Sequence, residues 1–430
     1  MKKLFFAVVL TIVSIVINAQ PKNETISKIA ESSLEYYGNI YRTIHSNPEL
    51  SLCEKETSAM VAKEMKRMGL EVHEGFGGYG VVGIFKNGDG PVVLLRADMD
   101  ALPIKEATGL PFASTKMCDV NGVQTPAFHA CGHDVHTTVM LGTVNALVSL
   151  KKGWKGTLIA LAEPAEEVGK GAHGIIDAGL FTKFPIPDYV LAYHVFPDSE
   201  VGSVEYSKGP AMAGVKDYDI TFKGKGAHGA YPHEGIDPIV MAANAVLEYQ
   251  TIVSRSVKAF EPAVVTVGAF NSGSRPNIIN EKAYLKITAR FFNEEVGNLI
   301  DRRIREITNA VAKAAGATDD MMPEIEMISP LPPVINNSEL VDKVVVSMKN
   351  ILGEANVHEN NSPSMAAEDF SLYRTASPKV QAAMFSLGVS PKGKHTTALH
   401  SPTFKPEFDG AYITGVQAMT RAIIDLMVSK

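Results

Sequence analysis

The sequence has few cysteines, no surplus of positive charge and only one long apolar run. It has only three cysteines, Cys53, Cys118 and Cys131, which are too few for a fold that disulfide bonds stabilise. The 41 lysines and arginines face 47 aspartates and glutamates, a net charge of -6. The chain therefore lacks the basic surplus that binding to a nucleic-acid backbone needs. With 45% hydrophobic residues and no repeat period, its composition is that of an ordinary folded protein.

The one apolar run lies at the start of the chain. Two lysines precede an apolar stretch, residues 4–17, which leads to the small residue Ala19. This order is typical of a secretory signal peptide, and the run is shorter than the about 20 residues that span a bilayer. We therefore expect residues 1–19 to be cleaved off, with an uncleaved anchor as the alternative. The mature protein is then expected to be exported to the periplasm or the medium and to have no membrane attachment.

The order of the expected helices and strands indicates two domains. Strand-like and helical patterns alternate up to about residue 194 and again from residue 338, as in an α/β fold with a mostly parallel sheet between helices. Between these parts the expected order is β-α-β-β-α-β, a ferredoxin-like unit. We therefore expect residues 20–211 and 329–430 to form one domain, into which residues 212–328 are inserted as a second.

Residues 129–136, HACGHDVH, carry the strongest chemical signal. Cys131 and His133 flank a glycine at the start of an expected helix, and thiolate and imidazole are common ligands of zinc-like ions. The neighbouring His129, Asp134 and His136 could supply further ligands or orient the first ones. Taken alone, the segment would also suit a helix start that happens to be rich in histidine.

Three expected strands end in residue types of acid-base and metal chemistry. These residues are Glu166 and Glu167, His194, and the pair Asp98 and Asp100. Each alone would be read as a solvated acid or a hydrogen-bonded histidine. Ligands of open α/β sheets, however, bind outside the carboxyl ends of the strands. Their coincidence at one edge therefore predicts a site where one carboxylate binds metal and its neighbour moves protons.

Six motifs together resemble the dinuclear metallopeptidase family of aminoacylases, hippurate hydrolases and plant auxin-conjugate amidohydrolases. They follow the family's order over nearly all of the mature chain: RADMDALP (96–103), HACGHD (129–134), PAEE (164–167), GKGAHGAYPH (224–233), AEDF (367–370) and LHSPTF (399–404). The resemblance implies that residues 20–211 and 329–430 form a di-metal catalytic domain. It also implies that residues 212–328 form a dimerisation or lid domain.

The resemblance assigns roles position by position. It makes Glu166 the general base. It makes His228 a residue that reaches the active site of a neighbouring subunit, and Asn277 and Arg290 the residues that hold the substrate's carboxylate. The implied metal ligands are Cys131, His133, Glu167, His194 and His400.

Asp98 and Asp100 lie in the first motif and are expected behind the ligands. The sequence departs from the family pattern at Val135, where glycine is usual, and at residues 277–280, where an ending in proline is more common. The second departure bears on the carboxylate pocket and not on the metal site.

We therefore expect an exported, metal-dependent amidohydrolase that works as a homodimer. It would cleave N-acyl or N-aroyl amino acids to a carboxylic acid and an amino acid. Two divalent ions, Zn²⁺ or Mn²⁺, would polarise the amide and activate a bridging water, whose proton Glu166 would take. One alternative is a dipeptidase or carboxypeptidase with the same site. Another is a non-catalytic metal- or ligand-binding protein, against which the spare carboxylate of Glu166 argues.

Overall fold

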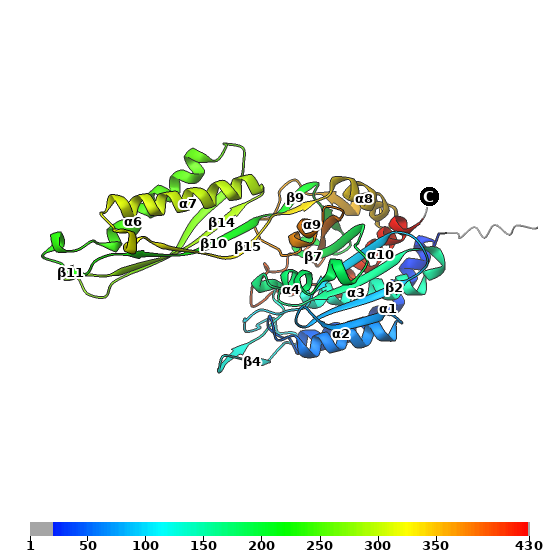
Figure 1. The fold of residues 1–430 in the computed structure, drawn as a ribbon. Coiled ribbons are helices and arrows are strands. Elements are labelled where there is room, and N and C mark those ends of the chain that lie inside the picture. Colours follow the sequence, from blue (N-terminus) through cyan, green and yellow to red (C-terminus); the bar gives the residue numbers. More distant parts are fainter. Residues whose placement is uncertain (1–19, 429–430) are drawn as a thin grey trace, which may run out of the picture.

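The computed structural model describes residues 20–428, so the predicted signal peptide, residues 1–19, lies outside the described part of the chain. None of the described helices is long and apolar enough to cross a membrane. The described residues form two bodies, each built on a sheet of its own (Figure 1).

The larger body is built on an eight-stranded sheet in the order β1-β2-β6-β3-β7-β18-β8-β17. Its strands are β1 (Glu71–Phe76), β2 (Gly80–Lys86), β3 (Val92–Asp98), β6 (Thr157–Glu163), β7 (Tyr189–Glu200), β8 (Val204–Tyr206), β17 (Val357–Glu359) and β18 (Gln381–Ser390). The four central strands, from β6 to β18, are parallel to one another, whereas β1, β2 and β8 run antiparallel to a neighbour. The expected α/β fold with a mostly parallel sheet is therefore confirmed.

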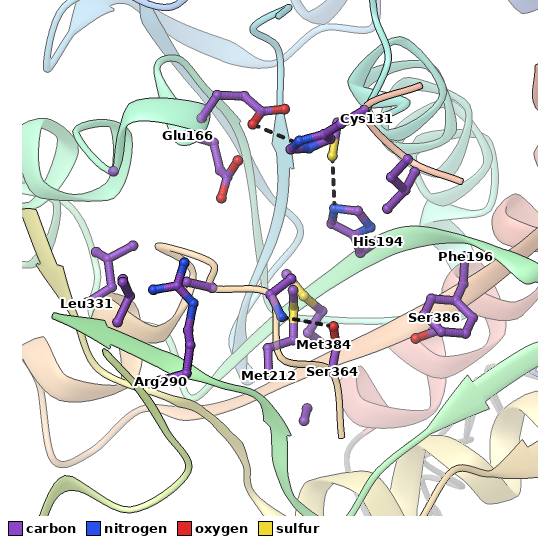
Figure 2. A pocket seen from close by; sticks show the side chains of 18 of the residues that line it. Cys131, Glu166, His194, Phe196, Met212, Arg290, Leu331, Ser364, Met384 and Ser386 are labelled. Carbon is purple, nitrogen blue, oxygen red and sulfur yellow. Dashed lines mark hydrogen bonds and ion pairs between the residues drawn. The ribbon is translucent and has the colours of Figure 1, made fainter. Parts of the chain in front are cut away.

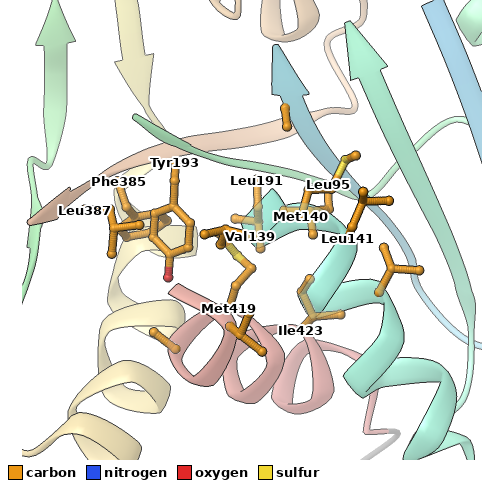
Figure 3. Packing of buried hydrophobic residues seen from close by; sticks show 14 of the residues in the cluster. Leu95, Val139, Met140, Leu141, Leu191, Tyr193, Phe385, Leu387, Met419 and Ile423 are labelled. Atoms are coloured by element: carbon orange, nitrogen blue, oxygen red, sulfur yellow. The ribbon is translucent and has the colours of Figure 1, made fainter. Parts of the chain in front are cut away.

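Helices cover both faces of this sheet. One face carries α1 (Asn23–Ser46), α2 (Lys55–Arg67), α3 (His133–Ser149), α8 (Ser338–Leu352) and α10 (Phe408–Met427). The other carries the short helices α4 (Gly171–Asp177), α5 (Leu180–Lys183) and α9 (Ser371–Ala376). The larger core lies under the first set, where Leu95, Leu191 and Phe385 of the sheet pack against Val139 of α3 and Met419 of α10 (Figure 3).

Helix α3 fixes the position of the HACGHDVH segment. Of its 17 residues, 14 are buried, as expected for a helix between the sheet and other helices. Each fully buried Leu, Val or Met contributes about 1.5–3 kcal/mol through the hydrophobic effect. The first turn of α3, which carries His133 and His136, is therefore held firmly at the edge of the sheet.

The smaller body is a four-stranded antiparallel sheet in the order β12-β14-β10-β15, with two helices packed on it. Its elements are β10 (Gly214–Lys223), α6 (Pro238–Thr251), β12 (Ala263–Asn271), β14 (Lys282–Phe291), α7 (Glu294–Ala314) and β15 (Glu324–Leu331). This chain order is the expected β-α-β-β-α-β unit. As the sequence indicates, Asp237 and Asn293 cap the two helices by accepting hydrogen bonds from backbone N–H groups.

Most elements that the sequence pattern misses are short. The missed strands are β1, β8, β17, the hairpin β4 (Met117–Val120) and β5 (Val123–Pro126), β9 (Gly209–Met212), β11 (Ala227–His228), β13 (Ile278–Ile279) and β16 (Val334–Asn336). The missed helical segments are α5, α9, η1 (Lys151–Gly153), η2 (Glu166–Val168), η3 (Pro232–Glu234), η5 (Asp319–Met321) and η6 (Glu354–Asn356). The helical turn η4 (Ile252–Ser256) continues α6 within the expected helical stretch 237–255. Strands of two to four residues contain too few side chains to show a period of two. All three cysteines are free, including Cys53 and Cys118, whose pairing the sequence leaves open.

Candidate active site

A cavity of ≈ 700 Å³ lies where the two bodies meet (Figure 2). The larger body lines it with Cys131, Glu166 and His194, and the smaller body with Val215 and Arg290. Strands β3 and β6 end beside this region at their carboxyl ends, which is where open α/β sheets bind ligands.

The five residues that the resemblance implies as metal ligands form one cluster. The Sγ of Cys131 lies 3.5 Å from Nε2 of His194. The Nε2 of His133 lies 3.8 Å from Oε1 of Glu167, and the Nε2 of His400 lies 3.7 Å from Oε2 of the same carboxylate. The structure thus brings these five donors together, and their binding of metal stays a prediction.

The cluster contains more than one compact set of donors. Cys131, His133 and His194 form one set, and Cys131, Glu167 and His400 form another, each with donor atoms within 4.8 Å of one another. Donor atoms bound to one zinc ion at about 2.0–2.3 Å lie within about 4.6 Å of one another. Each set is therefore close to the size that one ion needs, and the two sets share Cys131.

The local backbone explains how these side chains converge. Gly132 has a φ of 78°, and a Cβ there would lie 2.6 Å from Cγ2 of Val195, so only glycine fits between the two candidate ligands Cys131 and His133. Ala165 and His400 also adopt left-handed backbone, with φ of 56° and 60°. Such conformations cost about 1–3 kcal/mol each and cluster at functional sites.

Hydrogen bonds set the orientation of the histidines. His194 shares a hydrogen bond of 2.8 Å between its Nδ1 and the carbonyl oxygen of Val195, which leaves its Nε2 facing Cys131. His136 has both nitrogens engaged, with Asp98 at 2.6 Å and the backbone N–H of Val195 at 2.8 Å. Burial lowers the pKa of His136 to about 4, against the effect of Asp98. His136 therefore orients other groups and has no free donor for an ion.

Asp100 ties the Glu166–Glu167 turn to the start of α3. Its two carboxylate oxygens accept the backbone N–H groups of Glu166 and Glu167 at 3.2 and 3.1 Å. Its Oδ1 also lies 3.3 Å from Nδ1 of His133. Both predicted residues of the first motif, Asp98 and Asp100, thus stand directly behind the candidate ligands.

Glu54 supports the same turn and is missed by the sequence analysis. It is fully buried, and its Oε1 accepts hydrogen bonds from the N–H groups of Ala165 at 2.8 Å and Leu52 at 3.0 Å. Burial, assisted by the charge of Asp100, raises the pKa of its carboxyl to about 7. Because Glu54 precedes a helix like an ordinary surface acid, nothing in the sequence marks this role.

A buried ionic network links the AEDF motif to the site. The Arg96 guanidinium lies 2.7 Å from both Asp98 and Glu163, 2.8 Å from Glu368 and 3.0 Å from Asp369. Arg96 pairs with these four of the seven carboxyl groups in this region that are buried or nearly so; the other three are Asp100, Glu166 and Glu167. Buried negative charge in such excess is costly unless cations compensate it.

Several polar atoms at the cluster have no hydrogen-bond partner among the described residues. They are both ring nitrogens of His133, Oε1 of Glu167 and Oε2 of Glu368. Buried polar atoms are nearly always partnered, and these belong to imidazoles and carboxylates, which bind divalent metals. The unpartnered atoms and the excess of negative charge both fit divalent cations at this site.

Glu166 faces the cavity beside these donors. Its side chain is 9% exposed, and its Oε2 lies 3.9 Å from Nε2 of His133. Burial raises the pKa of its carboxyl well above the usual value, and the charges of Glu368 and Glu167 add to the effect. The carboxylate is thus close enough to the donors to exchange a proton with a group bound there.

The three predicted residues of the smaller body occupy two different places. Arg290 of β14 lines the cavity, and its Nη1 lies 3.6 Å from Oδ1 of Asp217. His228 and Asn277 lie together at the far end of the body, near β11, where the N–H of Gly229 donates to the carbonyl of Asn277 at 2.8 Å (Figure 1). Both are exposed and neither lines the cavity. Within one chain, only Arg290 joins the candidate site.

The chain has clear relatives of known family. Residues 94–425 match the family model of peptidase family M20/M25/M40. A hippurate hydrolase of Campylobacter jejuni is 38% identical over 338 residues, which cover 78% of this chain and 84% of that one. Among solved structures, a putative aminohydrolase of methicillin-resistant Staphylococcus aureus has a TM-score of 0.85 at 29% identity, over 95% of this chain and 100% of that one. A dinuclear metal-binding M20 peptidase of Bacillus subtilis has a TM-score of 0.75 at 27% identity, over 92% and 99% of the two chains.

Proposed function

Because this chain belongs to peptidase family M20/M25/M40 and is a metal-dependent hydrolase, we propose that it cleaves the amide bond of N-acyl or N-aroyl amino acids. The products are a carboxylic acid and an amino acid. The observation that carries the proposal is the Glu166 carboxyl. It lines one cavity together with four of the five donors of metal-ligand type, and the fifth donor, His133, lies 3.9 Å from it.

The metal would be held by Cys131, His133, Glu167, His194 and His400, with Zn²⁺ and Mn²⁺ as the two candidates. When bound, such a centre supplies Lewis acidity toward the amide carbonyl and lowers the pKa of water toward about 7. Thiolate and imidazole favour zinc, whereas the carboxylate leaves manganese open.

Glu166 would act as the general base. It would take the proton of the attacking water and pass it to the nitrogen of the leaving amine, so that one carboxyl serves both steps. The backbone N–H of Glu166 donates to Asp100, and that of the preceding Ala165 donates to Glu54. These two hydrogen bonds would keep the Glu166 carboxylate directed at the donors. Burial excludes bulk water from this proton transfer.

Arg290 would hold the carboxylate of the amino-acid half of the substrate. A guanidinium offers a planar fork that binds a carboxylate through two parallel hydrogen bonds. Its nearest acid, Asp217, lies at 3.6 Å and leaves donors of the fork free for a ligand. The substrate would therefore lie across the cavity, with its amide at the donors.

We further propose that the protein is a homodimer through its smaller body, in which His228 and Asn277 complete the partner's active site. His228 would donate a hydrogen bond to the carbonyl oxygen as negative charge develops there. Within residues 20–428, strand β12 is an edge of the sheet and pairs only with β14. Val240 and Leu247 on α6 are 55% and 70% exposed, and Phe270 on β12 is 41% exposed. An unpaired edge beside exposed apolar side chains favours association.

Export is also part of the proposal, with cleavage after Ala19 and delivery to the periplasm or the medium. Sequencing the amino terminus of the protein recovered outside the cytoplasm tests it, and a start at Gln20 is the expected result. A mature protein that begins at Met1 inside the cell would contradict it.

A substrate panel tests the activity. Metal-stripped enzyme and enzyme reconstituted with Zn²⁺ or Mn²⁺ would be offered N-acetyl amino acids, N-benzoyl amino acids and dipeptides. We expect hydrolysis of the first two classes only after metal is restored. A clear preference for dipeptides would instead identify a metallo-dipeptidase or carboxypeptidase, and metal binding without any hydrolysis would identify a binding protein.

A further inference from the structure

Three residues on neighbouring strands form a row across the larger sheet. His194 of β7 pairs with Ser386 of β18, and Ser386 pairs with Glu205 of β8. Residues directly paired on neighbouring strands project from the same face of a sheet. All three line the cavity, whereas the adjacent Leu387 and Val204 belong to the core on the opposite face. The row therefore forms a floor that leads from the candidate metal donors to Glu205.

Glu205 is a carboxylate without a cation. Its Oε2 accepts a hydrogen bond from Nδ2 of Asn360 at 3.1 Å, and its Oε1 accepts one from the hydroxyl of Ser199. It forms no ion pair with any described residue. Lys208, close in sequence, pairs with Asp342 instead, and His358, its neighbour on β17, does not line the cavity. A carboxylate has about four acceptor sites, so Glu205 can still accept donors from a ligand.

The position of Arg290 indicates which way the acyl half of the substrate would extend along this row. Figure 2 shows Arg290 on one side of the cavity and Phe196 and Ser386 on the other, with Cys131 and His194 at the donor cluster. If Arg290 holds the amino-acid half, the acyl half must extend from the donors along the row. Apolar side chains flank that path, among them Phe196, Met384 and Leu399.

We propose that Glu205 selects N-acyl amino acids whose acyl chain ends in an ammonium group about six bonds from the scissile carbonyl. The inference deepens the proposed function and rests on it. The backbones of neighbouring strands are about 4.8 Å apart, so the backbones of His194 and Glu205, two strands apart, are separated by about 10 Å. An extended chain of six bonds spans about 7 Å, and a charge-assisted hydrogen bond adds about 2.8 Å. An ammonium at that distance would supply the cation that Glu205 lacks, while the methylenes pack on the apolar walls.

Two isosteric substrates test this with the metal-loaded, full-length enzyme. N-(6-aminohexanoyl)- and N-heptanoyl derivatives of one amino acid differ only in ammonium against methyl. We expect the wild type to show an about tenfold higher kcat/KM for the amino substrate, the size of one charge-assisted hydrogen bond. Shorter 4-aminobutanoyl and longer 8-aminooctanoyl chains should be poorer substrates than 6-aminohexanoyl.

The variant Glu205→Gln should remove this preference and leave hydrolysis of the heptanoyl substrate nearly unchanged. Glu359→Gln, on the neighbouring strand β17 and outside the cavity lining, is the matched control and should behave as the wild type. Equal rates for both substrates in the wild type, or an equal loss on both in Glu205→Gln, would overturn the inference and leave the proposed function intact. Hydrolysis of neither substrate by a metal-loaded wild type that cleaves N-acetyl or N-benzoyl amino acids would overturn the inference alone, and failure on all of these substrates would overturn both.

Discussion

The Sγ atom of Cys131 lies 3.5 Å from Nε2 of His194, although 63 residues separate them in the sequence. The thiol is buried and forms no disulfide. Burial raises its pKa well above the usual value, with the charge of Glu167 adding to the effect. A divalent cation would stabilise the thiolate and accept the imidazole at the same time. The pair is therefore the part of the site that a metal explains most directly.

Replacing the Cys131 thiol tests whether it binds a metal ion. Cys131→Ser removes the soft ligand shared by two of the donor sets, so we expect loss of at least one metal equivalent per subunit and of activity. Metal analysis after dialysis measures the effect. Cys53→Ser and Cys118→Ser are matched controls, because both thiols are free and lie outside the donor sets, and each should keep its metal. Full metal content in Cys131→Ser would rule out the cysteine as a ligand.

Arg96 should contribute strongly to stability. Arg96→Met leaves four buried carboxylates without their common cation, and breaking a buried ion pair in this way costs about 3–5 kcal/mol. Denaturant unfolding of the metal-loaded protein measures the loss. Arg302→Met is the control, since Arg302 is 61% exposed and its ion pair with Glu306 is 3.8 Å long. Equal stability of both variants would show that the network is not needed for folding.

His45 should make stability depend on pH. Burial alone would lower its pKa, but hydrogen bonds to Asp134 at 2.7 Å and Glu106 at 3.2 Å outweigh this and raise the pKa to about 9. The unfolded value is about 6.5. The raised value means that its contribution is complete below pH about 6.5 and is lost as the pH rises to about 9.

The free energy of unfolding at pH 6 and pH 9 checks this prediction. The wild type should lose stability over this interval, and His45→Gln should lose clearly less, because it has no proton to release. Identical pH dependence in the two proteins would mean that another group is responsible.

Mixing two inactive variants tests whether His228 serves the partner subunit. In a heterodimer of Glu166→Gln and His228→Ala, one active site contains both Glu166 and the His228 of the other chain. Random exchange of subunits should therefore restore about a quarter of the wild-type activity. Each variant alone should stay inactive. If His228 acted within its own chain, the mixture would show no recovery of activity. Light scattering on the same mixture must confirm that dimers are present.

Much of the site could be predicted because its residues lie on or just after strands that were recognisable. The carboxyl ends of neighbouring parallel strands meet at one edge, so Asp98, Glu166 and His194 were expected to converge before any distance was known. The expected strand end at His194 was wrong, because β7 continues through it to Glu200. Gly132 and the start of α3 explain Cys131 and His133 in the same way. Here local pattern and a general rule of sheet topology were sufficient.

Other parts depend on contacts that no local pattern contains. Glu54 supports the Glu166 turn from 111 residues away, and Glu368 meets Arg96 across 272 residues. Glu205 faces the cavity only because β8 pairs with β18, and a strand of three residues has no detectable period. Such residues become visible only when the chain is folded.

The central claim is that five donors hold two divalent ions beside a spare carboxylate. Its most direct test is a crystal structure of the metal-loaded protein, with anomalous scattering recorded at the absorption edge of the metal. The account predicts two anomalous peaks per subunit, ligated by Cys131, His133, Glu167, His194 and His400, with Glu166 bound to neither. No peak at this cluster, or an ion bound by Glu166 in place of Glu167, would contradict it.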